Sequence, residues 1–135
     1  MDSSSYTEED VRQELFREMT ERLGYPASLI VLEKEISGLP HTGGRGKGRR
    51  LDLVCMAPGI HPCFSLYPIL IIECKRDALD GRALRQAMGY NAIVQAPFVC
   101  LANREERKTY LRKGKTWEYV PFLPPFGQLV ESCKR

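Results

Sequence analysis

The segment Ile69-Leu70-Ile71-Ile72-Glu73-Cys74-Lys75 decides the fold of this chain. Its four consecutive aliphatic residues predict a strand that is buried on both faces of a sheet. Side chains alternate across a strand, so Glu73 and Lys75 should point to one face and Cys74 to the other. An acid and a base at the end of such a strand indicate either an ion pair or a functional site.

A second apolar run carries a further acid. Asp52 lies within Leu51-Asp52-Leu53-Val54-Cys55, which also predicts a buried strand. Two carboxylates and an ammonium group on neighbouring inner strands are costly without a partner. A divalent cation is the natural partner, so we expect Mg²⁺, which Mn²⁺ could replace. Asp52 and Glu73 would bind it through oxygen, and the carbonyl of Cys74 would add a third ligand.

Length and charge limit the possible classes of protein. The 135 residues are enough for one hydrophobic core and too few for two. The net charge of +3 does not by itself indicate a nucleic-acid-binding protein. Basic residues are nevertheless concentrated in two stretches, namely Arg45, Lys47, Arg49 and Arg50, and then Lys108, Arg112, Lys113 and Lys115. With no secretory signal and no apolar run of membrane-spanning length, we expect a cytoplasmic protein without a membrane partner.

The order of the expected elements predicts the α/β class. Residues 1–6 should be a disordered lead-in, and Thr7 should cap a helix that ends at Gly24. The further expected elements are strands at 29–36, 50–56 and 69–75, a helix at 79–95, a strand at 97–102 and a hairpin around 113–115. A strand that follows a helix indicates a parallel crossover. The sequence therefore predicts a mixed central sheet flanked by helices in residues 7–126, followed by a C-terminal tail at 127–135.

Two segments between these elements are unusual. Residues 37–48 are rich in glycine and basic side chains and predict a mobile loop. The connection at 57–68 contains His61-Pro62-Cys63. A zinc site with Cys55 is conceivable there, but the spacing matches no zinc motif and a fourth ligand is missing. The role of His61 and Cys63 stays undetermined.

The two expected helices add four polar candidates. Glu8 and Arg12 fall within the apolar stripe of the first helix. They either pair with each other at i, i+4, or both face the strand ends that carry the acids. Gln86 and Tyr90 lie one turn apart on the second helix. Either Tyr90 is core and Gln86 is solvated, or Gln86 reaches the metal site or a DNA phosphate.

These residues together resemble the motifs of the PD-(D/E)xK nuclease superfamily. The order Asp52, Glu73-x-Lys75, Gln86-x-x-x-Tyr90 is similar to its pattern. More narrowly, the chain resembles the N-terminal nuclease domain of type I restriction enzyme R subunits and its stand-alone relatives. Further matches are Glu8-x-x-Val11-Arg12-Gln13, Leu23-Gly24-Tyr25-Pro26, Glu33-Lys34-Glu35-Ile36 and Arg50-Leu51-Asp52-Leu53-Val54. Ala102-Asn103 stands where the family usually has Thr-Asn-Gly, so the glycine is absent.

The resemblance implies a restriction-endonuclease-like core and Mg²⁺-dependent hydrolysis of phosphodiester bonds in DNA. It implies that Asp52 and Glu73 bind metal and that Lys75 is catalytic. Gln86 and Tyr90 would support the site or contact DNA, and Glu8 is the candidate for an extra metal ligand from the first helix.

Two departures from the family keep an alternative open. The linker from Asp52 to Glu73 is long, and the chain has no helicase-like motor. The alternative is a non-catalytic nucleic-acid-binding or interaction module within a larger restriction or repair complex. Phosphate contacts would then come from Arg45, Lys47, Arg49 and Arg50. Expected partners are DNA, other restriction or repair subunits, and a second copy of the chain, because cutting both strands usually needs two sites.

Overall fold

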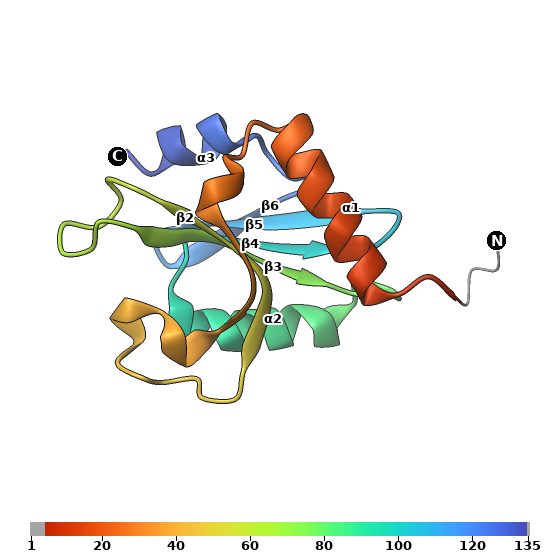
Figure 1. Cartoon of the computed structure of the whole chain (residues 1–135), viewed down its shortest axis with the longest axis horizontal. Helices are drawn as coiled ribbons and strands as arrows, with labels where there is room; N and C mark the ends of the chain where they lie inside the picture. The colour runs from red at the N-terminus through yellow and green to blue at the C-terminus, as the bar shows by residue number, and fades with distance from the viewer. Residues whose placement is uncertain (1–4, 135) are drawn as a thin grey trace.

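Six strands form one mixed sheet in the computed structural model, which describes residues 5–134 (Figure 1). The strands are β1 (Ile30–Glu35), β2 (Arg50–Ala57), β3 (Tyr67–Cys74), β4 (Phe98–Ala102), β5 (Arg107–Lys113) and β6 (Thr116–Val120). They lie side by side in chain order, and only β3 and β4 pair in parallel. The predicted mixed sheet is confirmed. Most of the lead-in expected at residues 1–6 lies outside the described residues.

Helix α2 (Gly81–Val94) makes the parallel pair possible because it returns the chain from β3 to the start of β4. Asp80 caps it by accepting a hydrogen bond from the backbone N–H of Ala83 at 3.0 Å. At the other end the Asn91 side chain exchanges two hydrogen bonds with Ala96, both 2.9 Å long. Asn91 is therefore a buried member of the inner face, whereas Tyr90 is only half-buried.

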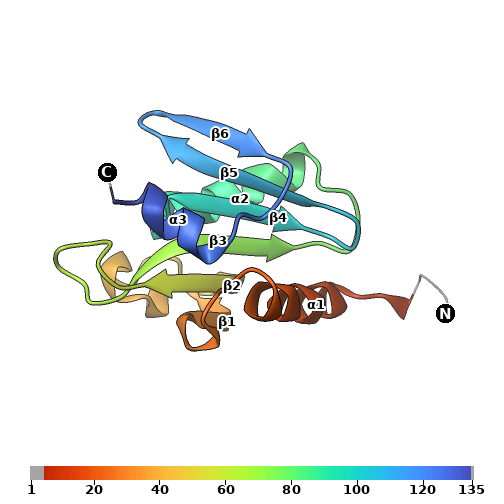
Figure 2. The same ribbon diagram turned by 90° about the horizontal axis from the view of Figure 1, so that it is seen from above.

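Helices cover both faces of the sheet (Figures 1 and 2). Helix α1 (Glu8–Glu21) and helix α3 (Phe126–Ser132) pack on one face, and α2 packs on the other. Every residue of β3 is buried, as the aliphatic run predicts. Alternate residues of β4 contribute to the two separate cores on either side of the sheet. Burial on both faces thus fixes the central strands that carry the candidate acids.

The first helix begins where the sequence predicts. Thr7 and Asp10 form a reciprocal capping box, in which Asp10 N donates to Thr7 Oγ1 at 3.2 Å and Thr7 N donates to Asp10 Oδ2 at 2.8 Å. The helix ends at Glu21, and Gly24 follows it in the left-handed conformation at φ +75°. The N-terminal end of α1 therefore has a defined position beside the sheet.

Helix α3 differs from the expectation of a tail at 127–135. Leu129 is buried in the core under α1, and the backbone N–H of Phe126 donates to Leu23 O at 3.0 Å. The hydroxyl of the buried Tyr25 donates to Pro124 O at 2.7 Å. These contacts join residues about a hundred positions apart, and a helix of 7 residues is too short to show a clear apolar period.

The segment 37–48 is not the mobile loop that the sequence predicts. Two short 3₁₀ turns, Ile36–Gly38 and Pro40–Thr42, lead into and through it, and Ile36, Leu39 and Thr42 are buried. His41 Nε2 donates to the carbonyl of Val94 at 2.6 Å, which ties the segment to the end of α2. The apolar residues of this segment are spaced irregularly among glycines. They are buried because they pack against α2.

Gly46 provides a test of this packing. Its φ is +80°, and a Cβ atom added to it would lie 2.5 Å from Ile36 Cγ2. Gly44 has φ +82° but no atom within 4 Å of such a Cβ. Gly46→Ala should therefore lower the free energy of unfolding by about 1–3 kcal/mol more than Gly44→Ala, because only the former adds overpacking to backbone strain. Urea unfolding measures both, and equal losses would contradict the observed packing.

Candidate active site

Asp52 and Glu73 lie opposite each other on β2 and β3. The antiparallel register pairs Leu53 with Ile72, so the next pair along the ladder is Asp52 with Glu73. Residues paired in this way share a face of the sheet. Asp52 Oδ2 also accepts a hydrogen bond from the backbone N–H of Cys74 at 2.7 Å, while the Cys74 side chain enters the core under α1. The expected alternation along this strand is therefore observed.

Burial against Asp52 raises the pKa of Glu73 when no cation is bound. Glu73 is 4% exposed, and this burial raises its pKa well above the ordinary value of 4.5. A hydrogen bond with the Asp52 side chain and the charge of Asp52 raise the pKa further, whereas Lys75 opposes the shift. These effects together favour the protonated form of Glu73 at pH values where an exposed carboxyl is ionised, because its pKa is raised.

Lys75 connects the end of β3 to helix α2. Its Nζ donates to Gln86 Oε1 at 2.7 Å, and Gln86 Nε2 donates to the Tyr90 hydroxyl at 3.4 Å. The backbone N–H of Lys75 donates to Ala102 O at 2.8 Å, which continues the β3–β4 ladder past the acids. Gln86 is exposed, but it is bonded to Lys75 rather than only solvated. Tyr90 both packs on the core under α2 and bonds to Gln86.

Helix α1 contributes Glu8 to the same region. Glu8, Lys75 and Gln86 line one small cavity of ≈ 140 Å³, together with residues of the turn between β3 and α2. Among the described residues no ion pair joins Glu8 to Arg12, so the first of the two alternatives, an i, i+4 pair, is wrong. Glu8 instead lines the cavity that Lys75 also lines.

Arg12 binds two other acids. Its Nη2 lies 2.8 Å from Glu9 Oε1, and its Nη1 lies 3.2 Å from Glu33 Oε1. Glu33 has φ +51°, a left-handed conformation that is uncommon for a residue with a side chain. The β1–β2 register places Glu33 between the pairs Leu32–Leu53 and Lys34–Leu51, opposite Asp52. Arg12 thus contacts the strand next to Asp52 and not the paired acids themselves.

Asn103 is a positioning residue that the sequence analysis used only as a motif match. It is 5% exposed, and its Nδ2 donates to the carbonyl of Asp77 at 2.9 Å. Its Oδ1 accepts hydrogen bonds from the backbone N–H groups of Glu105 and Glu106, at 3.0 and 2.8 Å. The side chain therefore joins the end of β4 to the turn that follows Lys75. In the sequence, the one sign of this role was that Asn103 directly follows a predicted buried strand.

The donors at this position fit a hard cation such as Mg²⁺. Asp52 and Glu73 supply two carboxylates. The backbone N–H and C=O of one strand residue point to the same side of the strand. Because the N–H of Cys74 donates to Asp52, the carbonyl of Cys74 also faces the strand of Asp52. Residues 5–134 contain no cluster of three or more His, Cys, Asp or Glu side chains with the geometry of a metal site. Mg²⁺ binds through one or two carboxylates and keeps several waters, which matches this small set of protein ligands.

The four basic residues of the glycine-rich segment are all exposed. Arg45 Nε donates to Thr42 O at 2.8 Å, which fixes part of its side chain. Within the described range, none of Arg45, Lys47, Arg49 and Arg50 forms an ion pair. Arg50 begins β2, two residues before Asp52, so the segment enters the sheet next to the acids.

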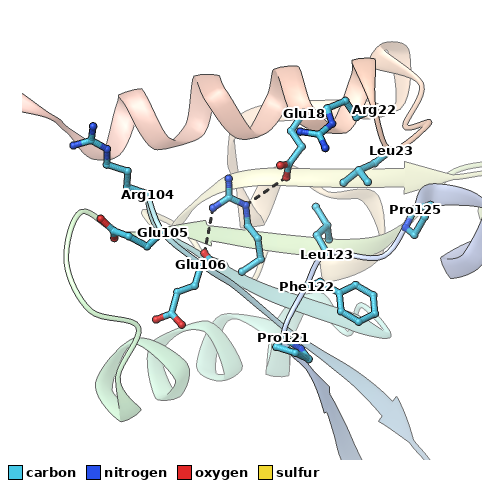
Figure 3. A pocket seen from close by; sticks show the side chains of 11 residues that line it. Glu18, Arg22, Leu23, Arg104, Glu105, Glu106, Pro121, Phe122, Leu123 and Pro125 are labelled. Carbon is cyan, nitrogen blue, oxygen red and sulfur yellow. Dashed lines mark hydrogen bonds and ion pairs between the residues drawn. The ribbon is translucent and has the colours of Figure 1, made fainter.

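A larger cavity of ≈ 600 Å³ lies on the other side of the sheet (Figure 3). It is bordered by α1, by the turn at 104–107 and by the segment at 121–125. Arg107 Nε lies 3.5 Å from Glu18 Oε1, and Arg107 Nη1 donates to the carbonyl of Glu106 at 3.2 Å. Its lining has three arginines and three glutamates, and it includes neither Asp52 nor Glu73. This larger cavity is therefore not the candidate active site.

Comparison with family models identifies the class of the chain. Residues 7–124 match the family described as type I restriction enzyme R protein N terminus (HSDR_N). The match covers most of the 135 residues, so the chain belongs to this family. Comparisons with curated proteins and with solved structures gave no match. In the described part of the chain, no helix has the length and apolar character needed to cross a membrane.

The proton held by Glu73 predicts a pH dependence of stability. The native state keeps this proton at pH values where the unfolded chain has lost it, so the free energy of unfolding falls as the pH rises above the ordinary carboxyl range. Glu73→Gln removes this penalty. Without metal, the variant should gain at least about 1.4 kcal/mol over the wild type between pH 5 and pH 8, the value of one pKa unit. Urea unfolding in chelator at both pH values checks this, and a difference that does not change with pH would contradict it.

Proposed function

We propose that this chain is a Mg²⁺-dependent nuclease of the PD-(D/E)xK type that hydrolyses phosphodiester bonds in DNA. One observation supports it above all others. Asp52 and Glu73 face each other at the end of two buried strands, and Lys75 follows with its ammonium group bonded to Gln86. Membership of the restriction enzyme R protein family agrees with this reaction class.

Each side chain has a distinct role in the proposed reaction. Asp52 and Glu73 would hold the cation, which would supply Lewis-acid chemistry by making a bound water more acidic and neutralising charge on the phosphate. Lys75 orients the attacking water or stabilises the pentavalent phosphate with its ammonium group. Gln86 fixes the position of that ammonium group through the 2.7 Å hydrogen bond, and Tyr90 supports Gln86. Glu8 lines the same cavity as Lys75 and is the proposed additional ligand, through water.

Substitution of the three central residues tests the reaction. Asp52→Asn, Glu73→Gln and Lys75→Ala should each lower the rate of DNA cleavage in Mg²⁺ or Mn²⁺ by at least about a hundredfold. Calorimetric Mn²⁺ titration should detect binding to the wild type and to Lys75→Ala, and little or none to Asp52→Asn. Glu118→Gln changes an exposed acid on β6 and is the matched control. A folded wild type that leaves plasmid, linear and branched DNA intact in both metals would overturn the proposal.

The basic segment supplies the proposed contacts to the DNA backbone. Arg45, Lys47, Arg49 and Arg50 are exposed and free of described ion pairs, so their charges are available to phosphates. The segment leads directly into β2 and Asp52. Phosphate contacts give similar affinity for all DNA sequences, and this affinity falls as the salt concentration rises.

Replacing these four residues with alanine should weaken binding to unrelated duplexes to the same extent. The slope of log K against log salt should fall by up to about 3.6, because each lost phosphate contact contributes about 0.9. Fluorescence anisotropy in chelator measures binding without cleavage. Arg17→Ala with Arg22→Ala removes exposed charge from α1 and its C-cap and should change the slope much less. A loss confined to one DNA sequence is the outcome that contradicts backbone contact.

A second candidate function follows from the small number of acids at the site. Among the described residues no third His, Cys, Asp or Glu joins Asp52 and Glu73 in a metal-site geometry, and burial raises the pKa of Glu73. A module of a restriction complex that binds DNA without cutting it is compatible with these observations. Wild-type protein that binds duplex DNA but neither takes up Mn²⁺ nor cleaves would favour this function over the nuclease.

A further inference from the structure

A groove between α2 and the β5–β6 hairpin has no role in the proposed cleavage site. Its volume is ≈ 340 Å³, which is within the range of small-ligand pockets, roughly 300–1,000 Å³. One wall is the C-terminal half of α2, with Met88 and Gln95, and the other is the hairpin. The hairpin supplies Arg112, Lys115 and Trp117. This is part of the second basic stretch that the sequence contains.

The groove is positively charged. No acidic residue lines it, and within residues 5–134 neither Arg112 nor Lys115 takes part in an ion pair. Arg112 Nε donates to Gly114 O at 3.2 Å, which orients the guanidinium while its two terminal NH₂ groups remain available. Two cations with this exposure attract an anion, and a phosphodiester backbone supplies anions at regular intervals.

An exposed aromatic side chain lies beside these cations. Trp117 is 37% exposed and pairs with Arg112 in the β5–β6 ladder, so both side chains point to the α2 face of the hairpin. Tyr119 is 48% exposed and its ring lies 5.4 Å from that of Tyr110 on the same face. Interleaved cations and aromatic rings are the arrangement with which proteins bind unpaired nucleic acid, because every base can stack on a ring.

Helix α2 connects the groove to the cleavage site. Gln86 bonds to Lys75, and Gln95 lines the groove nine residues further along the chain. At 1.5 Å per residue the two positions are about 13 Å apart, or roughly four steps of 3.4 Å along a DNA strand. Nine residues make two and a half turns of a helix, so Gln86 and the groove lie on opposite flanks of α2. A strand that passes Lys75 therefore reaches the groove by crossing over the helix.

We propose that this groove binds an unpaired DNA strand, with a base stacked on Trp117 and phosphates held by Arg112 and Lys115. This inference rests on the proposed nuclease function and names its substrate class, DNA that contains a single-stranded segment next to the cleavage site. Bases that remain paired in a duplex cannot stack on Trp117, so duplex DNA makes the phosphate contacts only.

Trp117 is the one tryptophan of the sequence, so its fluorescence reports on the groove alone. Single-stranded oligonucleotides added in chelator should quench this fluorescence, and a duplex of equal length should quench it much less. Binding measured by anisotropy should weaken about tenfold in Trp117→Ala, from the loss of one stacked base. The chelator separates this test from catalysis, because cleavage is measured only with metal present.

Two lysines of one hairpin provide the matched pair for the charge contacts. Lys115 lines the groove, whereas Lys113 is exposed and does not. Lys115→Gln should lower the salt slope for single-stranded DNA by about 0.7, and Lys113→Gln should leave it unchanged. Absence of quenching, equal quenching by duplex, or equal effects of the two lysine variants in folded protein would each overturn the inference. If the protein cleaves duplex DNA but fails these tests, the proposed function stands and only the inference about the groove is overturned.

Discussion

Two carboxyl groups meet where β2 and β3 leave the buried centre of the sheet, and the rest of the structure is arranged around that contact. Asp52 and Glu73 are brought together by the antiparallel register of two strands that are otherwise apolar. Burial of Glu73 makes its charged form costly and so raises its pKa in the absence of a cation. The proposed cation would stabilise both charges and would thereby couple metal binding to stability and pH.

Helix α2 gives this pair its surroundings. Its length allows β3 and β4 to pair in parallel, and the same helix presents Gln86 to Lys75. Its C-terminal end receives His41 and lines the groove that contains Trp117. One element therefore joins the fold, the candidate site and the proposed path of a DNA strand, so a shift of α2 would affect all three together.

The position of Asp52 also depends on an irregular strand. Glu33 interrupts β1 opposite Asp52 with a left-handed backbone conformation, and Arg12 binds its carboxylate from α1. Strain of this kind persists only when the surrounding structure supports it, and it is common near functional sites. The salt bridge links α1 to the edge of the sheet beside the candidate metal ligands, which gives the first helix a positioning role without direct contact to them.

Local pattern in the sequence was enough for the elements of the fold. The expected strands and helices agree with the observed ones to within about two residues at most boundaries, because aliphatic runs, capping residues and glycines act over short distances. The local pattern also indicated that Glu73 and Cys74 point to opposite faces of the sheet and that Asp52 lies on the neighbouring strand. A period of two along a strand and the order of the elements require no knowledge of distant contacts.

Tertiary structure alone decided which distant residues meet. Arg12 binds Glu33 rather than Glu8, Leu129 is buried in a short helix, and the glycine-rich segment packs on α2. The hydrogen bond between Lys75 and Gln86 likewise depends on how α2 lies on the sheet. Each of these contacts is chosen by the free energy of packing surfaces from separate parts of the chain, and neither spacing nor composition encodes that choice locally.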